Sequence, residues 1–201
     1  MKKHFAKTLI SIFTALALCL SATVFAAFTS RFSDIDGTEP YAGAVEILGA
    51  LEILAGYEDG SFGATKEISR AELLTIISRV QGYSGESKDP APFDDVPESH
   101  WANGYISFAA EKGIISGDGN GKFRPDDKVL YEEALKMLVC MFELDKDMDG
   151  NDLDKYVEVA ENAGLCENLI STPGSNIIRG DVVMALYNGL VSAAPPAVMS
   201  E

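Results

Sequence analysis

Apolar residues recur at helical spacing in several separate stretches of the chain, and polar, glycine-rich segments divide these stretches. Residues 42–54 place Ala44, Val45, Leu48 and Leu51 on one face of a predicted helix. The other stretches with apolar residues at this kind of spacing contain Leu73, Ile76, Ile77 and Val80; Tyr105, Ile106 and Ala109; Leu135, Leu138, Val139 and Phe142; Tyr156, Val157 and Ala160; and Val183, Leu186, Tyr187 and Leu190. The pattern predicts an all-α chain of short amphipathic helices.

Most of this pattern repeats after sixty-one positions. Phe32 matches Phe93 at that offset, and the pairs Asp34/Asp95, Val45/Ile106, Gly56/Gly117, Gly60/Gly121 and Phe62/Phe123 follow it. A fixed period that holds in loop glycines as well as in apolar residues indicates one supersecondary unit used more than once. A third, degenerate copy follows, in which Ile177 to Asp181 parallel Ile68 to Glu72. Units of this kind bury their apolar faces only by stacking, so we expect the three copies to form one body.

These repeats divide the chain into segments. We assign 1–26 to a signal peptide, 30–83 to repeat 1, 84–92 to a linker, 93–144 to repeat 2, 145–152 to an acidic linker, 153–192 to repeat 3 and 193–201 to a disordered tail or the start of a linker. The first segment has basic residues, a short apolar run and small residues ending at Ala26, which is typical of a secretory leader. We therefore expect a secreted chain with no membrane span after cleavage.

The turns between paired helices are rich in glycine, asparagine and aspartate, which predicts backbone with positive φ. Phe62 and Phe123 end these turns and are predicted to enter the core. Ser69 followed by Glu72 predicts a capping box at the start of a helix. Glu72 is also a candidate for contact with a ligand, but its spacing from Ser69 already explains the residue, so we favour the cap.

The chain is strongly acidic, with 31 Asp and Glu against 16 Lys and Arg and a formal charge of −15. Such a surface repels phosphate backbones, so nucleic acid is not an expected partner. Outside the leader the only histidine is His100, and no nucleophile elbow or metalloprotease motif is present in the sequence. We expect no enzymatic activity.

Several motifs in these repeats resemble the S-layer homology (SLH) repeat. The matching segments are Phe93 to Val96, His100 to Ala102, Gly113 to Gly117, Gly121 to Pro125 and, in repeat 1, Ile68 to Glu72. The resemblance implies an all-α, spindle-like array of three helix-loop-helix repeats with pseudo-threefold symmetry and grooves between neighbours. It also implies a non-catalytic module that anchors a protein to the cell wall at the cell surface by binding secondary cell-wall polysaccharide, which often carries ketal-linked pyruvate.

The resemblance directs attention to two arginines. Arg70 and Arg179 occupy the arginine position of the family's motif, each at the start of a predicted helix. A carboxylate on a sugar calls for a bidentate cation, which arginine supplies, and a helix N-terminus also favours an anion. The alternative role is a structural ion pair with one of the many carboxylates. Repeat 2 has Leu130 and Tyr131 at this motif and no arginine.

Aromatic and acidic residues are further candidates for sugar binding. Trp101 stands at the family's aromatic position, where it either stacks on a sugar or serves as a core aromatic, and Tyr41 is a partial substitute in repeat 1. Asp34 and Asp95 either accept sugar hydroxyls or cap the following turn. A groove that combines Arg70 with Trp101 is the first place we expect a ligand.

Two alternatives remain open. Asp145, Asp147 and Asp149, followed by Gly150, have the spacing of calcium ligands, but position twelve is Tyr156 instead of glutamate, so calcium competes with a solvated acidic linker. The second alternative is that the repeats have lost glycan binding and instead form contacts with other surface-layer proteins. Cys140 and Cys166 either form a disulfide or, as the apolar neighbours of Cys140 favour, remain free thiols.

Overall fold

The computed structural model describes residues 30–86, 89–146, 148 and 150–193; the predicted leader lies outside these ranges, and so does the tail after residue 193. Six α-helices make up the regular structure of the described part, which contains no β-sheet. They are α2 (Ala42–Ala50), α3 (Arg70–Val80), α4 (Asn103–Glu111), α5 (Tyr131–Met141), α6 (Leu153–Asn162) and α7 (Arg179–Ser192). The all-α prediction is confirmed.

The first helix of each repeat ends in the same way. α2 stops at Ala50, short of the predicted residue 54, because Glu52 adopts a left-handed φ of 59° and the Ile53 N–H turns back to the Leu48 carbonyl. Gly113 (φ 73°) and Gly164 (φ 77°) end α4 and α6 at the equivalent position. This arrangement is the usual left-handed C-terminal cap of a helix. Its presence after α6 shows that repeat 3 keeps this helix end despite its degenerate sequence.

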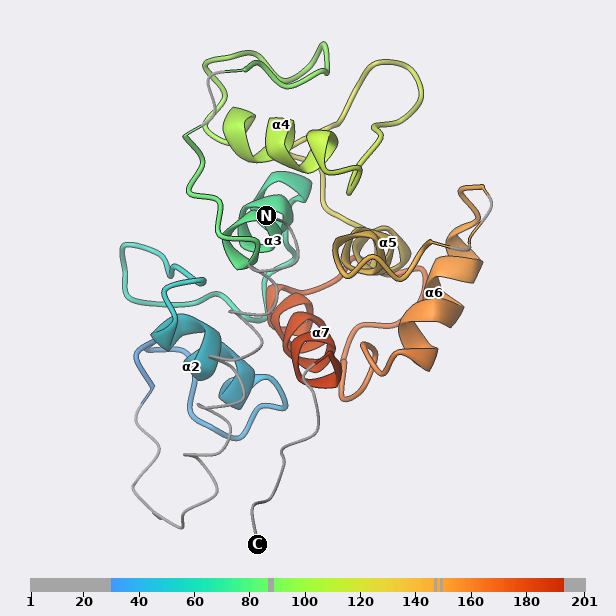
Figure 1. Ribbon diagram of the computed structural model, residues 1–201. Helices are drawn as coiled ribbons and strands as arrows, with labels where there is room; N and C mark the ends of the chain where they lie inside the picture. Colours follow the sequence, from blue (N-terminus) through green and yellow to red (C-terminus); the bar gives the residue numbers. More distant parts are fainter. Residues whose placement is uncertain (1–29, 87–88, 147, 149, 194–201) are drawn as a thin grey trace, which may run out of the picture.

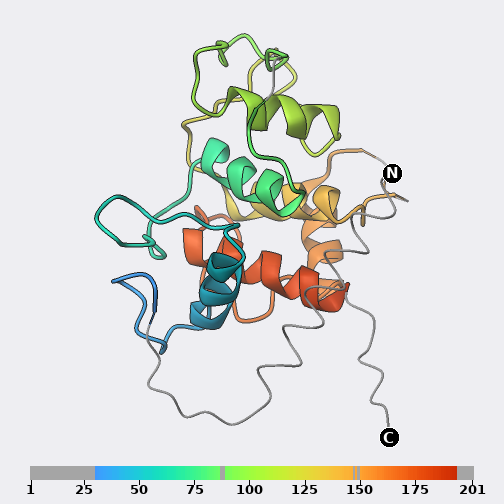
Figure 2. The same cartoon turned by 60° about the vertical axis from the view of Figure 1, so that its left-hand side comes forward.

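The helices pair between repeats. α3 of repeat 1 packs on α4 of repeat 2, α5 of repeat 2 packs on α6 of repeat 3, and α7 of repeat 3 packs on α2 of repeat 1. The second helix of each repeat therefore lies at the centre, with the first helices arranged around it (Figures 1 and 2). This pairing closes the array on itself, since the last repeat covers the first.

A ring of backbone hydrogen bonds joins the three segments that precede the central helices. The Ile68 N–H donates to the Ile177 carbonyl, that of Ile177 to Val129, and that of Val129 to Ile68. All three side chains are buried. This cyclic pattern marks the pseudo-threefold axis that the family resemblance implies. Degenerate repeat 3 donates one of these hydrogen bonds and accepts another, as the other two repeats do.

The predicted core positions of the turns are confirmed. Phe62 and Phe123 are fully buried, and each ring contacts the phenylalanine that opens its own repeat, Phe32 at 5.2 Å and Phe93 at 5.5 Å between ring centroids. Asp34 and Asp95 follow these opening residues and so lie beside the turn. The core thus fixes the turn against the start of the repeat.

Cys140 and Cys166, the two cysteines among the described residues, are free thiols. Cys140 is half-buried beside Asp145 and Tyr156, and burial followed by the nearby Asp145 carboxylate raises its pKa to about 11. Cys166 lies beside Tyr131 instead, and burial raises its pKa as well. Both thiols therefore stay protonated and unreactive, as the apolar surroundings of Cys140 predicted.

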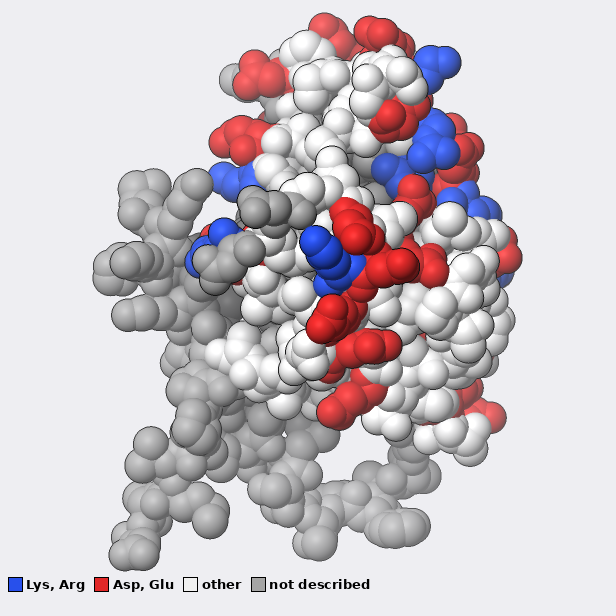
Figure 3. Space-filling view, turned by 90° about the vertical axis from the view of Figure 1, so that its right-hand side faces the viewer, with Lys and Arg blue, Asp and Glu red and all other residues white. Residues whose placement is uncertain are grey.

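The surface of the described part is acidic. Figure 3 shows the face at the right of Figure 1, where Asp and Glu side chains form a band across the middle, with Lys and Arg side chains beside it and near the top of the view. Across the described ranges no helix combines the length and apolar character that a membrane span requires.

Candidate functional site

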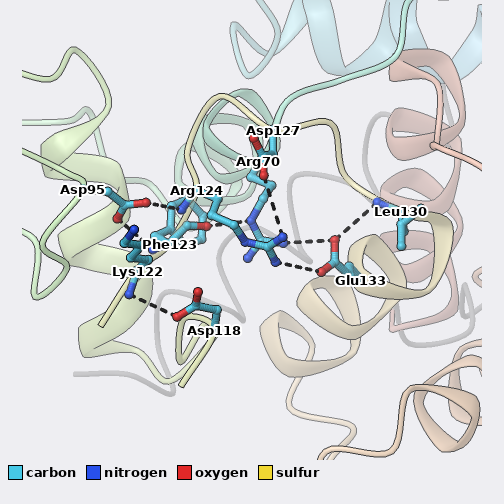
Figure 4. A network of polar contacts seen from close by, with 9 residues as sticks. All are labelled: Arg70, Asp95, Asp118, Lys122, Phe123, Arg124, Asp127, Leu130 and Glu133. Carbon is cyan, nitrogen blue, oxygen red and sulfur yellow. Dashed lines mark hydrogen bonds and ion pairs between the residues drawn. The ribbon is translucent and has the colours of Figure 1, made fainter. Parts of the chain in front are cut away.

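The Arg70 side chain lies at the interface between repeats 1 and 2 (Figure 4). Arg70 is the first residue of α3, and its Nε donates to the Phe123 carbonyl at 2.8 Å. Its guanidinium lies 4.7 Å from the centroid of the Phe123 ring and 3.1 Å from Glu133 Oε2. Only 6% of the residue is exposed. Arg70 is therefore a buried cation held by a ring, a carbonyl and a carboxylate.

The surrounding charges keep this arginine satisfied. Burial lowers the pKa of Arg70, while the neighbouring Glu133 carboxylate opposes that shift. Glu133 also lies 3.6 Å from Arg124 and accepts the Leu130 N–H, so one carboxylate serves two guanidinium groups and a helix start. An arginine keeps its charge even so, because its pKa starts far above neutral pH.

Arg179 occupies the equivalent place between repeats 3 and 1 but is held less completely. It begins α7, and its Nη2 donates to the Ala55 carbonyl at 2.9 Å. Its nearest carboxylate, Glu72 Oε1, is 4.0 Å away. The guanidinium lies 4.8 Å from the centroid of the Phe62 ring, and its buried Nε has no hydrogen-bond partner in the described part of the chain.

Tyr57 forms the outer wall of the Arg179 site. Its ring lies 5.6 Å from the Arg179 guanidinium and 4.1 Å from the Lys66 ammonium, and 37% of the residue is exposed. The hydroxyl donates to Glu72 at 3.4 Å. Two cations thus flank one partly exposed ring, an arrangement that suits an anionic group attached to a sugar.

The third interface, between repeats 2 and 3, carries no arginine. Tyr131 stands in its place and lies beside Cys166, and burial followed by this contact raises the pKa of Tyr131. Asp181 stands where the other repeats have glutamate and is fully buried, accepting the Ile170 and Ser171 N–H groups. Asp181 thus holds the degenerate turn of repeat 3. The interface between repeats 2 and 3 has no guanidinium group that could bind an anion.

Asp34 and Asp95 cap the turns. Asp34 accepts the Phe62 and Gly63 N–H groups at 2.6 and 2.7 Å, and Asp95 accepts those of Phe123 and Arg124 at 2.8 and 2.7 Å. Burial raises the pKa of each carboxyl, but these hydrogen bonds outweigh it, so that the pKa falls below its ordinary value. Of the two predicted roles, the structure shows the cap.

Trp101 is exposed, unlike Tyr41. Fifty-nine per cent of Trp101 is accessible, and its ring stacks beside His100, whose Nε2 lies 3.8 Å from Asp126. Trp101 is therefore available to a sugar and is not a core aromatic. The Asp127 carbonyl, next to Asp126 in the chain, accepts the Arg70 N–H. The described contacts of Trp101 and Arg70 do not join these two side chains, so the predicted groove that combines them remains a prediction.

The structure corrects the prediction for Tyr41. Its side chain is 3% exposed, and its ring lies against Gly180 of α7. A ring enclosed between α2 and α7 has no face left for a sugar. The prediction for Glu72 as a cap is confirmed: the Ser69 hydroxyl accepts the Glu72 N–H, and the Glu72 carboxylate accepts the Ser69 N–H.

The predicted calcium loop is only partly described. Asp147 and Asp149 lie outside the described residues, while Asp145 is described and contacts the Cys140 thiol. Among the residues whose placement is given, no group of three or more His, Cys, Asp or Glu could hold a metal ion.

Sequence reasoning missed Glu133, Arg124 and Tyr57 as members of these sites. Glu133 stands sixty-one positions after Glu72, so the repeat offset itself could have identified it. Tyr57 belongs to the glycine-rich turn of repeat 1, and nothing in its local pattern shows that an arginine from the far end of the chain reaches it.

Comparison with known proteins agrees with this architecture. Residues 31–74 and 92–135 match the family model of the S-layer homology domain. These two segments are therefore S-layer homology domains, and such domains form cell-wall anchoring modules.

Three relatives illustrate where such modules occur. A "Cell surface protein" of Thermoanaerobacter kivui is 34% identical over 92% of this chain and 24% of its own length. A "Middle cell wall protein" of Brevibacillus brevis is 30% identical over 88% of this chain and 17% of its own. An "Endoglucanase" of a Bacillus species is 31% identical over 56% of this chain and 12% of its own. The chain thus spans a quarter or less of the length of these relatives. Its S-layer homology domains and these relatives indicate a secreted, wall-associated protein of the cell surface.

Proposed function

We propose that this chain anchors a protein to the cell wall, without catalysis, by binding secondary cell-wall polysaccharide at the interfaces between its repeats. The observation that carries the proposal is the Arg179 site, where a buried guanidinium keeps an unpartnered Nε beside the partly exposed Tyr57 ring. A pyruvyl ketal presents a carboxylate on a sugar ring and therefore suits such a site.

The Arg70 site is the second candidate and differs in access. Its guanidinium already contacts Glu133 at 3.1 Å and the Phe123 carbonyl at 2.8 Å, so an incoming carboxylate competes with Glu133. We expect the exposed Trp101 to supply the aromatic surface for a sugar at this site. We therefore rank Arg179 before Arg70, and we expect no anion binding at the Tyr131 interface.

The test is co-sedimentation of residues 27–201 with cell-wall sacculi, before and after chemical removal of the non-peptidoglycan polymer. Arg179→Gln should weaken binding by roughly tenfold or more, since a charged hydrogen bond contributes about 1.5–3 kcal/mol. Arg70→Gln should weaken it less. Tyr131→Phe is the control, because it changes the equivalent position of the interface without an arginine.

Binding that persists on stripped walls, or that Arg179→Gln leaves unchanged, contradicts the proposal. Contact with other surface-layer proteins would then take its place. Parallel assays with calcium and with a chelator test the expectation that Asp145, Asp147 and Asp149 bind calcium, because a calcium-ordered joint would make wall binding depend on the ion.

A further inference from the structure

A shallow cavity of about 550 Å³ lies between repeat 1 and α4 of repeat 2, beside the Arg179 site. It is lined by the segment after α2 (residues 51–55), the last turn of α3, the start of the linker and α4, with Arg31 at its edge. This volume is in the range of small-ligand sites. Ala55 belongs to the lining, and its carbonyl accepts the bond from Arg179. The cavity and the Arg179 site therefore share a wall.

The two arginines of this cavity differ from the others in the chain. Of the five arginines, Arg70, Arg124 and Arg179 lie within 4.0 Å of a carboxylate. Arg31 and Arg79 have no such ion pair with any described residue, and both line the cavity. Glu52 is the one carboxylate in the lining, so the charge of the lining is positive within a chain of formal charge −15.

Aromatic contacts hold the arginine and tyrosine side chains in place. Arg79 lies 6.0 Å from the centroid of the Tyr105 ring, and the Arg31 guanidinium donates to the Gly49 carbonyl at the end of α2. Gly85 fixes Tyr105 from the linker side, because a Cβ there would come within 2.6 Å of the ring. The Arg31 guanidinium also lies 5.8 Å from the centroid of the Phe32 ring. Both arginines are thus oriented by their neighbours and keep further N–H donors for a ligand.

The Tyr83 hydroxyl at this cavity also lacks a hydrogen-bond partner among the described residues. The Tyr83 ring stacks on Phe108, with centroids 4.4 Å apart and planes at 4°, and meets the edge of Tyr105 at 5.9 Å. The Tyr105 hydroxyl donates to the Ser84 carbonyl, but the buried Tyr83 hydroxyl has no partner among the described residues. Buried hydroxyls are nearly always hydrogen-bonded, so this one marks a place for a polar ligand atom.

We propose that this cavity binds a second, carboxylate-bearing sugar residue of the polysaccharide whose first anionic residue occupies the Arg179 site. Arg31 and Arg79 contact the carboxylate, and Tyr83 and Tyr105 contact the sugar. The inference rests on the proposed function, because the shared Ala55 wall makes the two sites successive positions along one saccharide chain.

The test is calorimetric titration of residues 27–201 with wall-polysaccharide fragments of one and of four sugar residues. Arg79→Gln and Arg31→Gln should each weaken the tetrasaccharide roughly tenfold and leave the monosaccharide unchanged, since each removes one charged hydrogen-bond donor. Lys112→Gln is the control, because it removes a nearby charge that is outside the lining and paired with Glu111. Tyr83→Phe should also weaken the tetrasaccharide while leaving the urea unfolding midpoint unaltered.

Competition experiments identify the anion. A glucuronate oligosaccharide should displace the tetrasaccharide from Arg179→Gln, whereas displacement by inorganic phosphate alone overturns the carboxylate assignment. If Arg79→Gln and Arg31→Gln bind the tetrasaccharide as Lys112→Gln does, the inference fails, and a loss confined to Arg179→Gln then leaves the proposed function standing. If Arg179→Gln changes nothing while Arg79→Gln loses affinity, the cavity stands as an anion site and the proposed function fails.

Discussion

Some polar side chains in this protein are fully hydrogen-bonded within the fold, whereas others keep a donor without a partner among the described residues. Asp34 and Asp95 hold turns by accepting two N–H groups each. The arginines show the same division, because Arg70 is satisfied by Glu133 while Arg179 keeps a donor without a partner. Equivalent positions of the repeat thus differ in how completely the surrounding residues satisfy the side chain.

The role of Asp95 leads to a prediction about acid stability. Asp95→Asn should lower the free energy of unfolding at pH 7 by about 1–3 kcal/mol, because an amide has one oxygen for two N–H donors and no charge. The lowered pKa of Asp95 stabilises the folded state fully above the ordinary value of 3.8, and this contribution disappears as the pH falls below it. Urea unfolding from pH 7 to pH 2 should therefore show a weaker acid dependence in Asp95→Asn.

The neighbouring residue supplies the control. Asp94→Asn makes the same change one position earlier, where the carboxylate is exposed and accepts no N–H group in the described hydrogen bonds. An Asp94→Asn curve that matches that of Asp95→Asn would refute the cap as the source of the effect.

At the scale of elements, close approach between helices of different repeats explains where the chain uses glycine. Gly180 in the first turn of α7 faces the Tyr41 ring of α2, and a Cβ at this position would lie 2.6 Å from the ring. Gly43 of α2, in contrast, has no atom within 4 Å of where its Cβ would be. One glycine permits packing between repeats 1 and 3, and the other only weakens its helix.

The two glycines make a matched pair of variants. Gly180→Ala should destabilise the protein by about 1–3 kcal/mol, because the rigid ring of Tyr41 must move to admit the methyl group. Gly43→Ala should stabilise it by about 0.5–1 kcal/mol, since alanine loses less backbone entropy in a helix. Urea unfolding followed by circular dichroism measures both changes. Equal effects in the two variants would show that α2 and α7 do not approach as the structure has them.

At the scale of the whole molecule, the three repeats pack into one closed body. The packing of α7 on α2 and the hydrogen-bond ring through Ile68, Val129 and Ile177 make each repeat depend on both others. In an open solenoid a terminal repeat contacts one neighbour only. Here repeat 3 is required to complete the core of repeat 1, although its turn is altered and its interface with repeat 2 has no arginine.

Removal of repeat 3 tests this dependence. A chain of residues 27–152 should lose cooperative unfolding, because α2 and α5 lose the helices that cover them. The comparison chain of residues 27–193 keeps all six helices and should unfold in a single sigmoidal transition. Thermal and urea melts followed by circular dichroism distinguish the two. A sharp transition in the shorter chain would mean that the first two repeats form an independent unit.

The sequence by itself determined the local structure of this protein. The helical spacing, the sixty-one-residue offset, the capping box of Ser69 and Glu72 and the burial of Phe62 and Phe123 were all predicted, because each depends on residues close together in the chain or on the repeat. The motifs of the repeats also identified the family and, through it, the two arginines.

Only the tertiary structure decided which helices pair and which side chains stay accessible. An amphipathic pattern shows that a helix has a face to bury but does not name the partner, which here comes from another repeat. For the same reason Tyr41 is enclosed by α7 while Trp101 is exposed, although both stand near the start of a first helix. Whether Arg179 keeps a free donor depends on Ala55, Glu72 and Tyr57, which lie more than a hundred positions away in the chain.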